Sequence, residues 1–156
     1  MPPPGVTFTA SGTPGSDAVY LQQNSQTNAS TLVLDVMAKD VTNLFAVGFD
    51  LHYPTQLLAY SKVTEGPFMS HGGQVKTSLL LSERQKGDLV IGLSRLGNVT
   101  GRNGSGVLMT LRFAASGAGT DSLTFTNEAA YDGTIRQTGQ PIQGFGWFAG
   151  SVTVRP

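Results

Sequence analysis

Two side chains of the metal-ligating type lie two positions apart in the sequence, Asp50 and His52. Residues i and i+2 of a β-strand point to the same side of a sheet, so a carboxylate and an imidazole there could approach one cation. A protein metal site takes three or four ligands. The second histidine, His71, belongs to a distant glycine-rich segment. We therefore interpret the pair as the polar surface of a strand, and a metal site is the less favoured alternative.

The acidic residues do not form a pattern typical of hydrolases. Glycosidases need two carboxyl groups at a fixed separation across the scissile bond, and the spacing singles out no pair among Glu65, Glu83, Asp88, Glu128 and Asp132. The chain has no cysteine, which excludes disulfides, thiolate metal sites and a thiol nucleophile. Its glycine-rich segments lack the Gly-Lys-Ser/Thr of a phosphate-binding loop. We expect no enzymatic activity and no cofactor.

The most aromatic segment contains Phe145, Trp147 and Phe148. Exposed coplanar rings could stack on sugars, as in carbohydrate-binding modules, and polysaccharide binding is kept as the alternative function. Packing of these rings against the core is the favoured interpretation. A structural module without a discrete partner site is a third, weaker option.

The strand that must position Asp50 and His52 is predicted at residues 44–53. Alternate side chains point to opposite faces of a strand. One alternate set is large and apolar and comprises Phe45, Val47, Phe49, Leu51 and Tyr53. The other set is small and then polar and comprises Ala46, Gly48, Asp50 and His52. This pattern predicts a strand with one face on a core and the other face free, ended by Pro54.

Short alternating segments separated by turn residues occur along the rest of the chain, and none has a sustained helical period. Further strands are predicted at residues 6–10, 19–22, 31–38, 57–63, 74–82, 89–96, 106–115, 122–127 and 151–154. Turns are predicted at 39–43, 83–88 and 116–121, with a hairpin at Asp132-Gly133. Phe68 and Met69 are expected to point inward. The sequence therefore predicts an all-β antiparallel sandwich.

The composition suits one domain that makes few charged contacts. Of the 156 residues, 39% are hydrophobic and 13% charged, with a net charge of zero, whereas ordinary domains carry about 25% charged residues. We expect no nucleic-acid partner, because no basic patch stands out, and no membrane insertion, because no apolar run is long enough. Residues 1–17 are interpreted as a linker remnant that contains an extra strand, and residues 18–156 as the sandwich domain of a larger secreted protein.

The order of these segments resembles a cohesin domain. The resemblance is carried by residues 32–58, VTEGPF at 63–68, LVIGLSRLGNVTG at 89–101, residues 104–125 and GSVTV at 150–154. It implies a nine-stranded antiparallel β-sandwich with jelly-roll topology. It also implies a protein–protein recognition module that binds a dockerin-type partner outside the cell or at its surface, for assembly or anchoring. Calcium is then expected on the dockerin.

The resemblance places the partner on one sheet face, built from residues 44–53, 74–82 and 89–96. Ala46 and Gly48 would let the partner approach closely, while Asp50 and His52 would supply orienting hydrogen bonds. The other residues expected at this site are Leu80, Val90 and Gly92 at the centre, Ser82 and Ser94 as polar contacts, and Asn98 and Arg102 as a rim.

Two departures from the family pattern bear on specificity. Many cohesins have Tyr-Asp-Pro where this chain has Tyr53-Pro54-Thr55. Cohesins of the first cellulosomal type often have Asn and Asp at the positions of Ala46 and Gly48. These differences predict a flatter and more apolar face, which would suit a non-cellulosomal partner.

Overall fold

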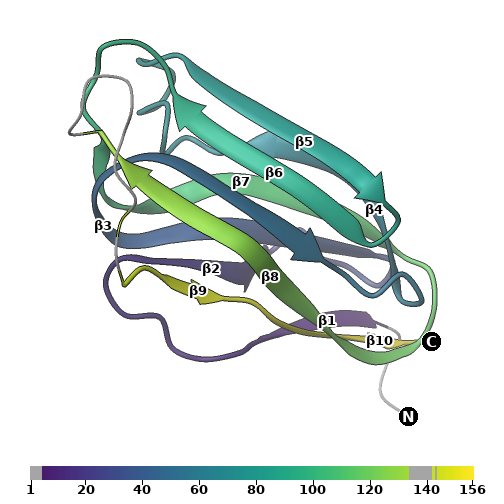
Figure 1. Ribbon diagram of the computed structural model, residues 1–156. Helices are drawn as coiled ribbons and strands as arrows, with labels where there is room; N and C mark the ends of the chain where they lie inside the picture. The colour runs from purple at the N-terminus through teal and green to yellow at the C-terminus, as the bar shows by residue number, and fades with distance from the viewer. Residues whose placement is uncertain (1–4, 134–141, 143) are drawn as a thin grey trace.

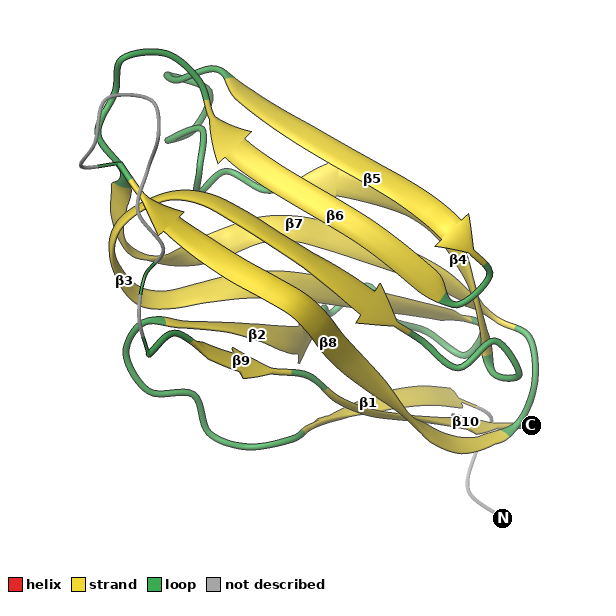
Figure 2. Cartoon of the chain, in the orientation of Figure 1, coloured by secondary structure: helices red, strands yellow, loops and turns green. Residues whose placement is uncertain are grey.

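The computed structural model describes residues 5–133, 142 and 144–156, which form ten β-strands and no helix (Figures 1 and 2). The strands are β1 Gly5–Ala10, β2 Ala18–Gln23, β3 Thr31–His52, β4 Leu58–Glu65, β5 Thr77–Gln85, β6 Asp88–Arg95, β7 Arg102–Ala115, β8 Gly119–Asp132, β9 Gly146–Phe148 and β10 Gly150–Arg155. The predicted all-β sandwich is confirmed. Within these residues no segment is a helix suited to crossing a membrane.

The 22-residue strand β3 belongs to both layers of the sandwich (Figure 1). Its first half pairs with β2 and β7, and its second half pairs with β6 and β8. One layer therefore runs β5-β6-β3-β8 and continues through β10 to β1, and the other runs β4-β7-β3-β2-β9. All of these strand pairs are antiparallel except the short pair β2–β9, which is parallel.

The turn predicted at residues 39–43 is not a break between two strands. The pairing of β3 with β7 shifts register between Ala38 and Val41 and again between Val41 and Leu44. Asp40 and Asn43 have φ angles of 47° and 58°, a conformation that Asp and Asn tolerate better than most residues. Such bulges bend a strand and increase its twist, which lets one strand pass from one layer to the other.

The apolar residues predicted to alternate along 44–53 point into the core. Val47, Phe49, Leu51 and Tyr53 are buried, with at most 6% of each side chain exposed. Phe45 is half-buried. A buried apolar side chain of this size contributes about 1.5–3 kcal/mol to folding. Because these side chains point inward, the alternate set that contains Gly48 belongs to the opposite side of the strand.

Phe68 and Met69 are also buried, so the inward positions predicted for them are confirmed. The N-terminal strand β1 pairs with β10 along its whole length. Val6 and Phe8 of β1 contribute to the core. The strand within the N-terminal segment therefore packs as part of the sandwich.

Two predicted turns differ from the structure, and one predicted hairpin lies partly outside the described residues. The β5–β6 connection is a tight turn at Lys86-Gly87, where Gly87 has a φ of 89°, and not a six-residue charged turn. Strand β8 begins at Gly119, within the turn predicted at 116–121, and continues to Asp132. The second strand of the hairpin predicted at Asp132-Gly133 falls at residues 134–141, outside the described residues.

Candidate functional site

The register of the sheet brings most of the predicted site residues onto one face. Gly48 of β3 lies opposite Gly92 of β6, which in turn lies opposite Leu80 of β5. Directly opposed residues of paired strands share a face. The same register places Ala46 opposite Ser94, Asp50 opposite Val90, and Val90 opposite Ser82. We call this surface of β5, β6, β3 and β8 the glycine face.

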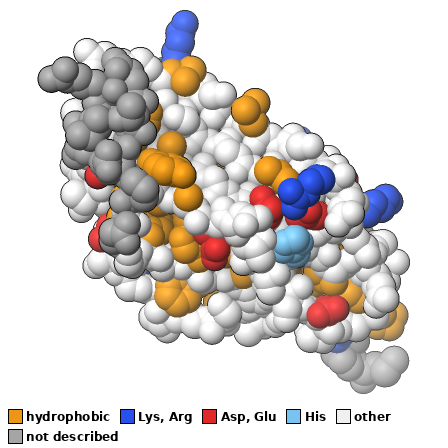
Figure 3. Space-filling view, viewed as in Figure 1, with side chains coloured by type: hydrophobic (Ala, Val, Ile, Leu, Met, Phe, Trp, Pro, Cys, Tyr) orange, Lys and Arg blue, Asp and Glu red, His pale blue; other side chains and the backbone are white. Residues whose placement is uncertain are grey.

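The centre of the glycine face is bare. A Cβ atom built on Gly92 would meet no heavy atom within 4 Å, and one on Gly48 would meet only the carbonyl oxygen of Ile91, at 3.8 Å. Leu80 lies beside them with 70% of its surface exposed, and Tyr131 of β8 is 37% exposed. In the view of Figure 3 the densest group of acidic and basic side chains lies beside the histidine at one end of the molecule, and only single charged side chains are seen elsewhere. No described loop of the chain therefore fills the space above the two glycines.

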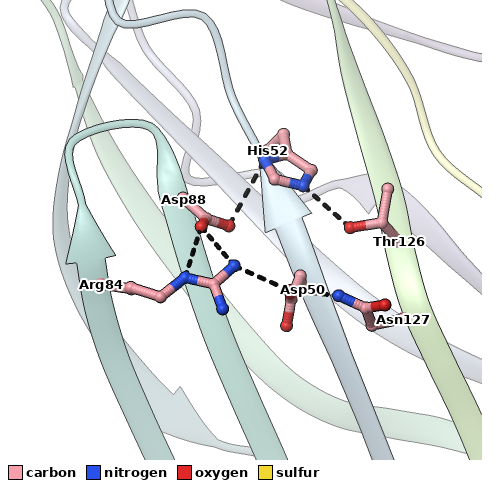
Figure 4. A network of polar contacts seen from close by, with 6 residues as sticks. All are labelled: Asp50, His52, Arg84, Asp88, Thr126 and Asn127. Atoms are coloured by element: carbon pink, nitrogen blue, oxygen red, sulfur yellow. Dashed lines mark hydrogen bonds and ion pairs between the residues drawn. The ribbon is translucent and has the colours of Figure 1, made fainter.

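A polar network closes one end of this face (Figure 4). Arg84 of β5 donates to Asp88 Oδ2 from Nε at 2.8 Å and from Nη2 at 2.6 Å, and to Asp50 Oδ2 from Nη2 at 3.0 Å. Asn127 of β8 donates to the same Asp50 oxygen at 2.8 Å. The hydrogen bonds and charge of Asp88, with a smaller contribution from Asp50, raise the pKa of the Arg84 guanidinium.

Asp50 was expected to offer hydrogen bonds to a partner, and the structure corrects this. Its side chain is buried, with 7% exposed, because Arg84 and Asn127 cover its carboxylate. Arg84, whose side chain is 57% exposed, is the group that this network presents to solvent. An exposed guanidinium here offers donors where the sequence analysis expected an acceptor.

His52 keeps a partly exposed ring at the same end. Its Nε2 lies 2.8 Å from Thr126 Oγ1, and its Nδ1 lies 3.3 Å from Asp88 Oδ1. The second contact brings opposite charges together when the ring is protonated, but it is not a hydrogen bond, so buried Asp88 Oδ1 has no hydrogen-bond donor. Across residues 5–133, 142 and 144–156, no three His, Asp or Glu side chains are placed to hold a metal ion.

Arg84, Asp88 and Asn127 were not predicted as site residues. The alternation that placed Leu80 and Ser82 outward also extends to Arg84, but the run 83–88 was interpreted as a turn. Asn127 has a φ of 51° and lies where the β3–β8 pairing shifts register between Gly48 and Asp50. No local sequence signal marks that bulge.

The predicted rim residues do not lie together on the glycine face. Asn98 is exposed in the segment between β6 and β7. Arg102 lies opposite Leu44, which is fully buried, so its side chain starts on the inner side of the sheet. Its Nε donates to the carbonyl oxygen of Phe68 at 2.8 Å, and its guanidinium carbon lies 4.9 Å from the centre of the Phe68 ring.

Trp147 packs among other aromatic rings. Its ring centre lies 5.8 Å from that of Phe49, 5.6 Å from that of Phe125 and 5.6 Å from that of Phe145, with interplanar angles of 56°, 68° and 50°. These are tilted or edge contacts, of the kind that aromatic pairs prefer, and the rings pack against the core. The described rings do not form the coplanar platform that the carbohydrate-binding alternative predicts.

Comparison with known proteins identifies the fold. No protein-family model and no curated protein sequence matches the chain. Among solved structures, it is similar to a non-cellulosomal cohesin of the archaeon Archaeoglobus fulgidus, with 16% identity, a TM-score of 0.59, and coverage of 94% of this chain and 88% of that one. The sixth cohesin of Acetivibrio cellulolyticus scaffoldin B, in complex with a mutant Cel5 dockerin, gives 15% identity, a TM-score of 0.69, and coverage of 87% and 97%.

A cohesin module from a family 33 glycoside hydrolase of Clostridium perfringens is similar over 97% of this chain and 95% of its own, with 10% identity and a TM-score of 0.61. The chain therefore has the fold of cohesin modules, and the resemblance drawn from the sequence is confirmed at this level.

Proposed function

We propose that this chain is a non-catalytic recognition module whose glycine face binds a dockerin-type protein. The observation that carries the proposal is the side-chain-free strip at Gly48 and Gly92 beside exposed Leu80. The cohesin fold supports it, because the related Acetivibrio cellulolyticus module was solved in complex with a dockerin. The protein would act outside the cell or at its surface, in assembly or anchoring.

The chemistry of the face suits a protein partner. Two paired glycines let another backbone approach the sheet more closely than any other residue pair would allow. A protein–protein interface of ordinary size buries about 800 Å² on each partner, and a few central residues dominate its energy. Leu80 supplies apolar area next to the glycines, and desolvating it on binding contributes favourably.

The ends of the face give the contact its orientation. Arg84 presents guanidinium donors at one end, held in place by two buried carboxylates. His52 lies beside it on the next strand but one. Polar groups at the border of an interface set register and association rate more than affinity, so we assign these two residues to orientation.

Titration of dockerin modules into this chain, with and without calcium, gives the direct test. Dockerin modules encoded in the same genome would be titrated into this chain by calorimetry, first with calcium and then with a chelator. We expect at least one to bind with a Kd of about 1 µM or tighter in calcium and to lose that binding in chelator. The unfolding temperature of this chain alone should not change with chelator, since the calcium belongs to the partner. Failure of every such dockerin to bind would overturn the proposal.

A further inference from the structure

Arg95, the last residue of β6, is a cation buried without a counter-ion. On β6 the inward positions are Leu89, Ile91, Leu93 and then Arg95, which has only 5% of its surface exposed. Its Nε is fully enclosed and has no hydrogen-bond partner.

No acidic side chain of the chain neutralises Arg95. All ten Asp and Glu residues lie within the described part of the chain. Asp50 and Asp88 pair with Arg84, and Asp88 also with His52, and no ion pair between two described residues involves Arg95. A buried charge without a partner is strongly unfavourable. An anion bound from solution would therefore stabilise this arginine.

A second arginine lies at the same end of the sandwich. Strands β6 and β7 lie along the same edge of β3, with Ser94 opposite Ala46 and Arg102 opposite Leu44. The stacking of Arg102 on Phe68, and its Nε–H bond to the Phe68 carbonyl oxygen, fix its guanidinium plane. Burial, and to a smaller extent the nearby charge of Arg102, lower the pKa of Arg95.

A hollow lies next to the end of β6 that carries Arg95, although neither Arg95 nor Arg102 lines it. This hollow of about 660 Å³ is lined by Thr77, which lies opposite Arg95, by Leu96, which follows Arg95, and by Lys76. Glu65 also lines this hollow, but its carboxylate accepts a hydrogen bond from Thr77 Oγ1 at 2.6 Å and forms no ion pair.

We propose that Arg95 and Arg102 form a binding site for a small oxyanion, such as a carboxylate, at the β6–β7 end of the sandwich. The planar fork of an arginine matches the two oxygens of such a group. The Arg95 side chain is held by burial and the Arg102 guanidinium is fixed against Phe68, so both cations are held in place for one ligand. The site lies on the inner side of the sheet and is independent of the glycine face.

Thermal unfolding in acetate and in sulfate, with chloride adjusted to constant ionic strength, tests this proposal. We expect the unfolding temperature to rise and then level off with one of the two anions. The rise is about 2–4 °C at five times the dissociation constant. Arg95→Met, which removes the charge at similar length, should abolish the saturable rise. Lys62→Met, which removes an exposed charge on β4, should retain it.

Arg102→Lys provides a second variant should Arg95→Met fail to fold. It keeps the charge but loses the fork and the Phe68 stacking, and its half-saturation concentration should rise at least tenfold. Sulfate stabilises many proteins without binding a site, and that effect grows without saturation in every variant. A response of only this kind, or a saturable response that Arg95→Met and Arg102→Lys share unchanged, would overturn the proposal.

Discussion

Gly48 and Gly92 lie opposite each other in the β3–β6 pair. At both positions the fold has room for a side chain, so packing within the chain does not require glycine. A Cβ atom at either position would meet no crowding. Glycine weakens a strand, so two unforced glycines in register at the centre of an exposed face are not explained by packing. The proposed docking of another protein on this face would explain them.

The first prediction compares two glycines of the chain. Gly92→Ala should raise the free energy of unfolding by about 0.5–1 kcal/mol, because the strand gains rigidity and the methyl group has room. Gly66→Ala should lower it by about 1–3 kcal/mol, since its Cβ would lie 2.4 Å from the carbonyl oxygen of Val107. Urea unfolding measures both. Equal losses in the two variants would show that Gly92 is a structural requirement.

The second prediction separates neighbours on β5. Leu80→Ser should change the free energy of unfolding by less than about 0.5 kcal/mol, because Leu80 projects into solvent. Leu81→Ser should lower it by about 1–2 kcal/mol, because Leu81 packs against the core. Denaturant titrations of the two proteins make the comparison. If Leu80→Ser lowered the free energy of unfolding as much as Leu81→Ser does, Leu80 would not be a solvent-exposed residue of the glycine face.

The third prediction concerns the coupling of Arg84 and Asp88. Removing the guanidinium leaves the buried carboxylates of Asp50 and Asp88 without their shared cation. Arg84→Met should therefore lower the urea midpoint, and it should do so less in an Asp88→Asn background. A double-mutant cycle isolates this coupling, with Lys86→Met at the adjacent turn as control. Identical effects of Arg84→Met in both backgrounds would contradict the network.

The fourth prediction is a loss of stability in alkali. Burial, and then the hydrogen bond from its hydroxyl to Glu83, raise the pKa of Tyr53, and burial with the charge of Glu83 raises that of Tyr60. A raised folded-state pKa means that this contribution is present below the unfolded value, about 10, and disappears as pH rises through the folded value. The free energy of unfolding should therefore fall above about pH 10.

Tyr53→Phe tests this contribution directly. It removes the bond to Glu83 and the acceptor of the Tyr60 N–H, which should lower the free energy of unfolding by about 1 kcal/mol at neutral pH. Its decline between pH 9 and 11 should be shallower than that of the unmodified chain. Parallel declines in urea titrations would show that Tyr53 does not titrate in this way.

Strand alternation was enough to predict the fold class and most of the glycine face. Val47, Phe49 and Leu51 are inward because large apolar residues at every second position require a buried side. The same period placed Gly48 and Gly92 outward. These orientations depend only on neighbouring residues of one strand, so the alternation of large and small residues along the sequence predicts them.

The features that sequence reasoning missed depend on bulges and long-range pairing. The alternation of β3 correctly places Asp50 on the outward face. Its carboxylate is nevertheless covered by Asn127, which lies at the β8 bulge, and by Arg84, whose side chain extends across β6. Arg102 is on a strand whose inward side is set by its pairing with Leu44. A change of one residue in register reverses every side chain of a strand, and no local pattern specifies such a change.

The binding of a dockerin to Gly48→Arg tests the central claim most directly. An arginine there would stand at the middle of the face, where the open space lets it fold without steric strain. Gly15→Arg is the matched control, because Gly15 also has open space but lies between β1 and β2. The probe is the dockerin that shows calcium-dependent binding to the unmodified chain, titrated by calorimetry. We predict at least a hundredfold loss of affinity in Gly48→Arg, with an unchanged unfolding temperature and normal affinity in Gly15→Arg. Unchanged affinity in a folded Gly48→Arg protein would contradict the account.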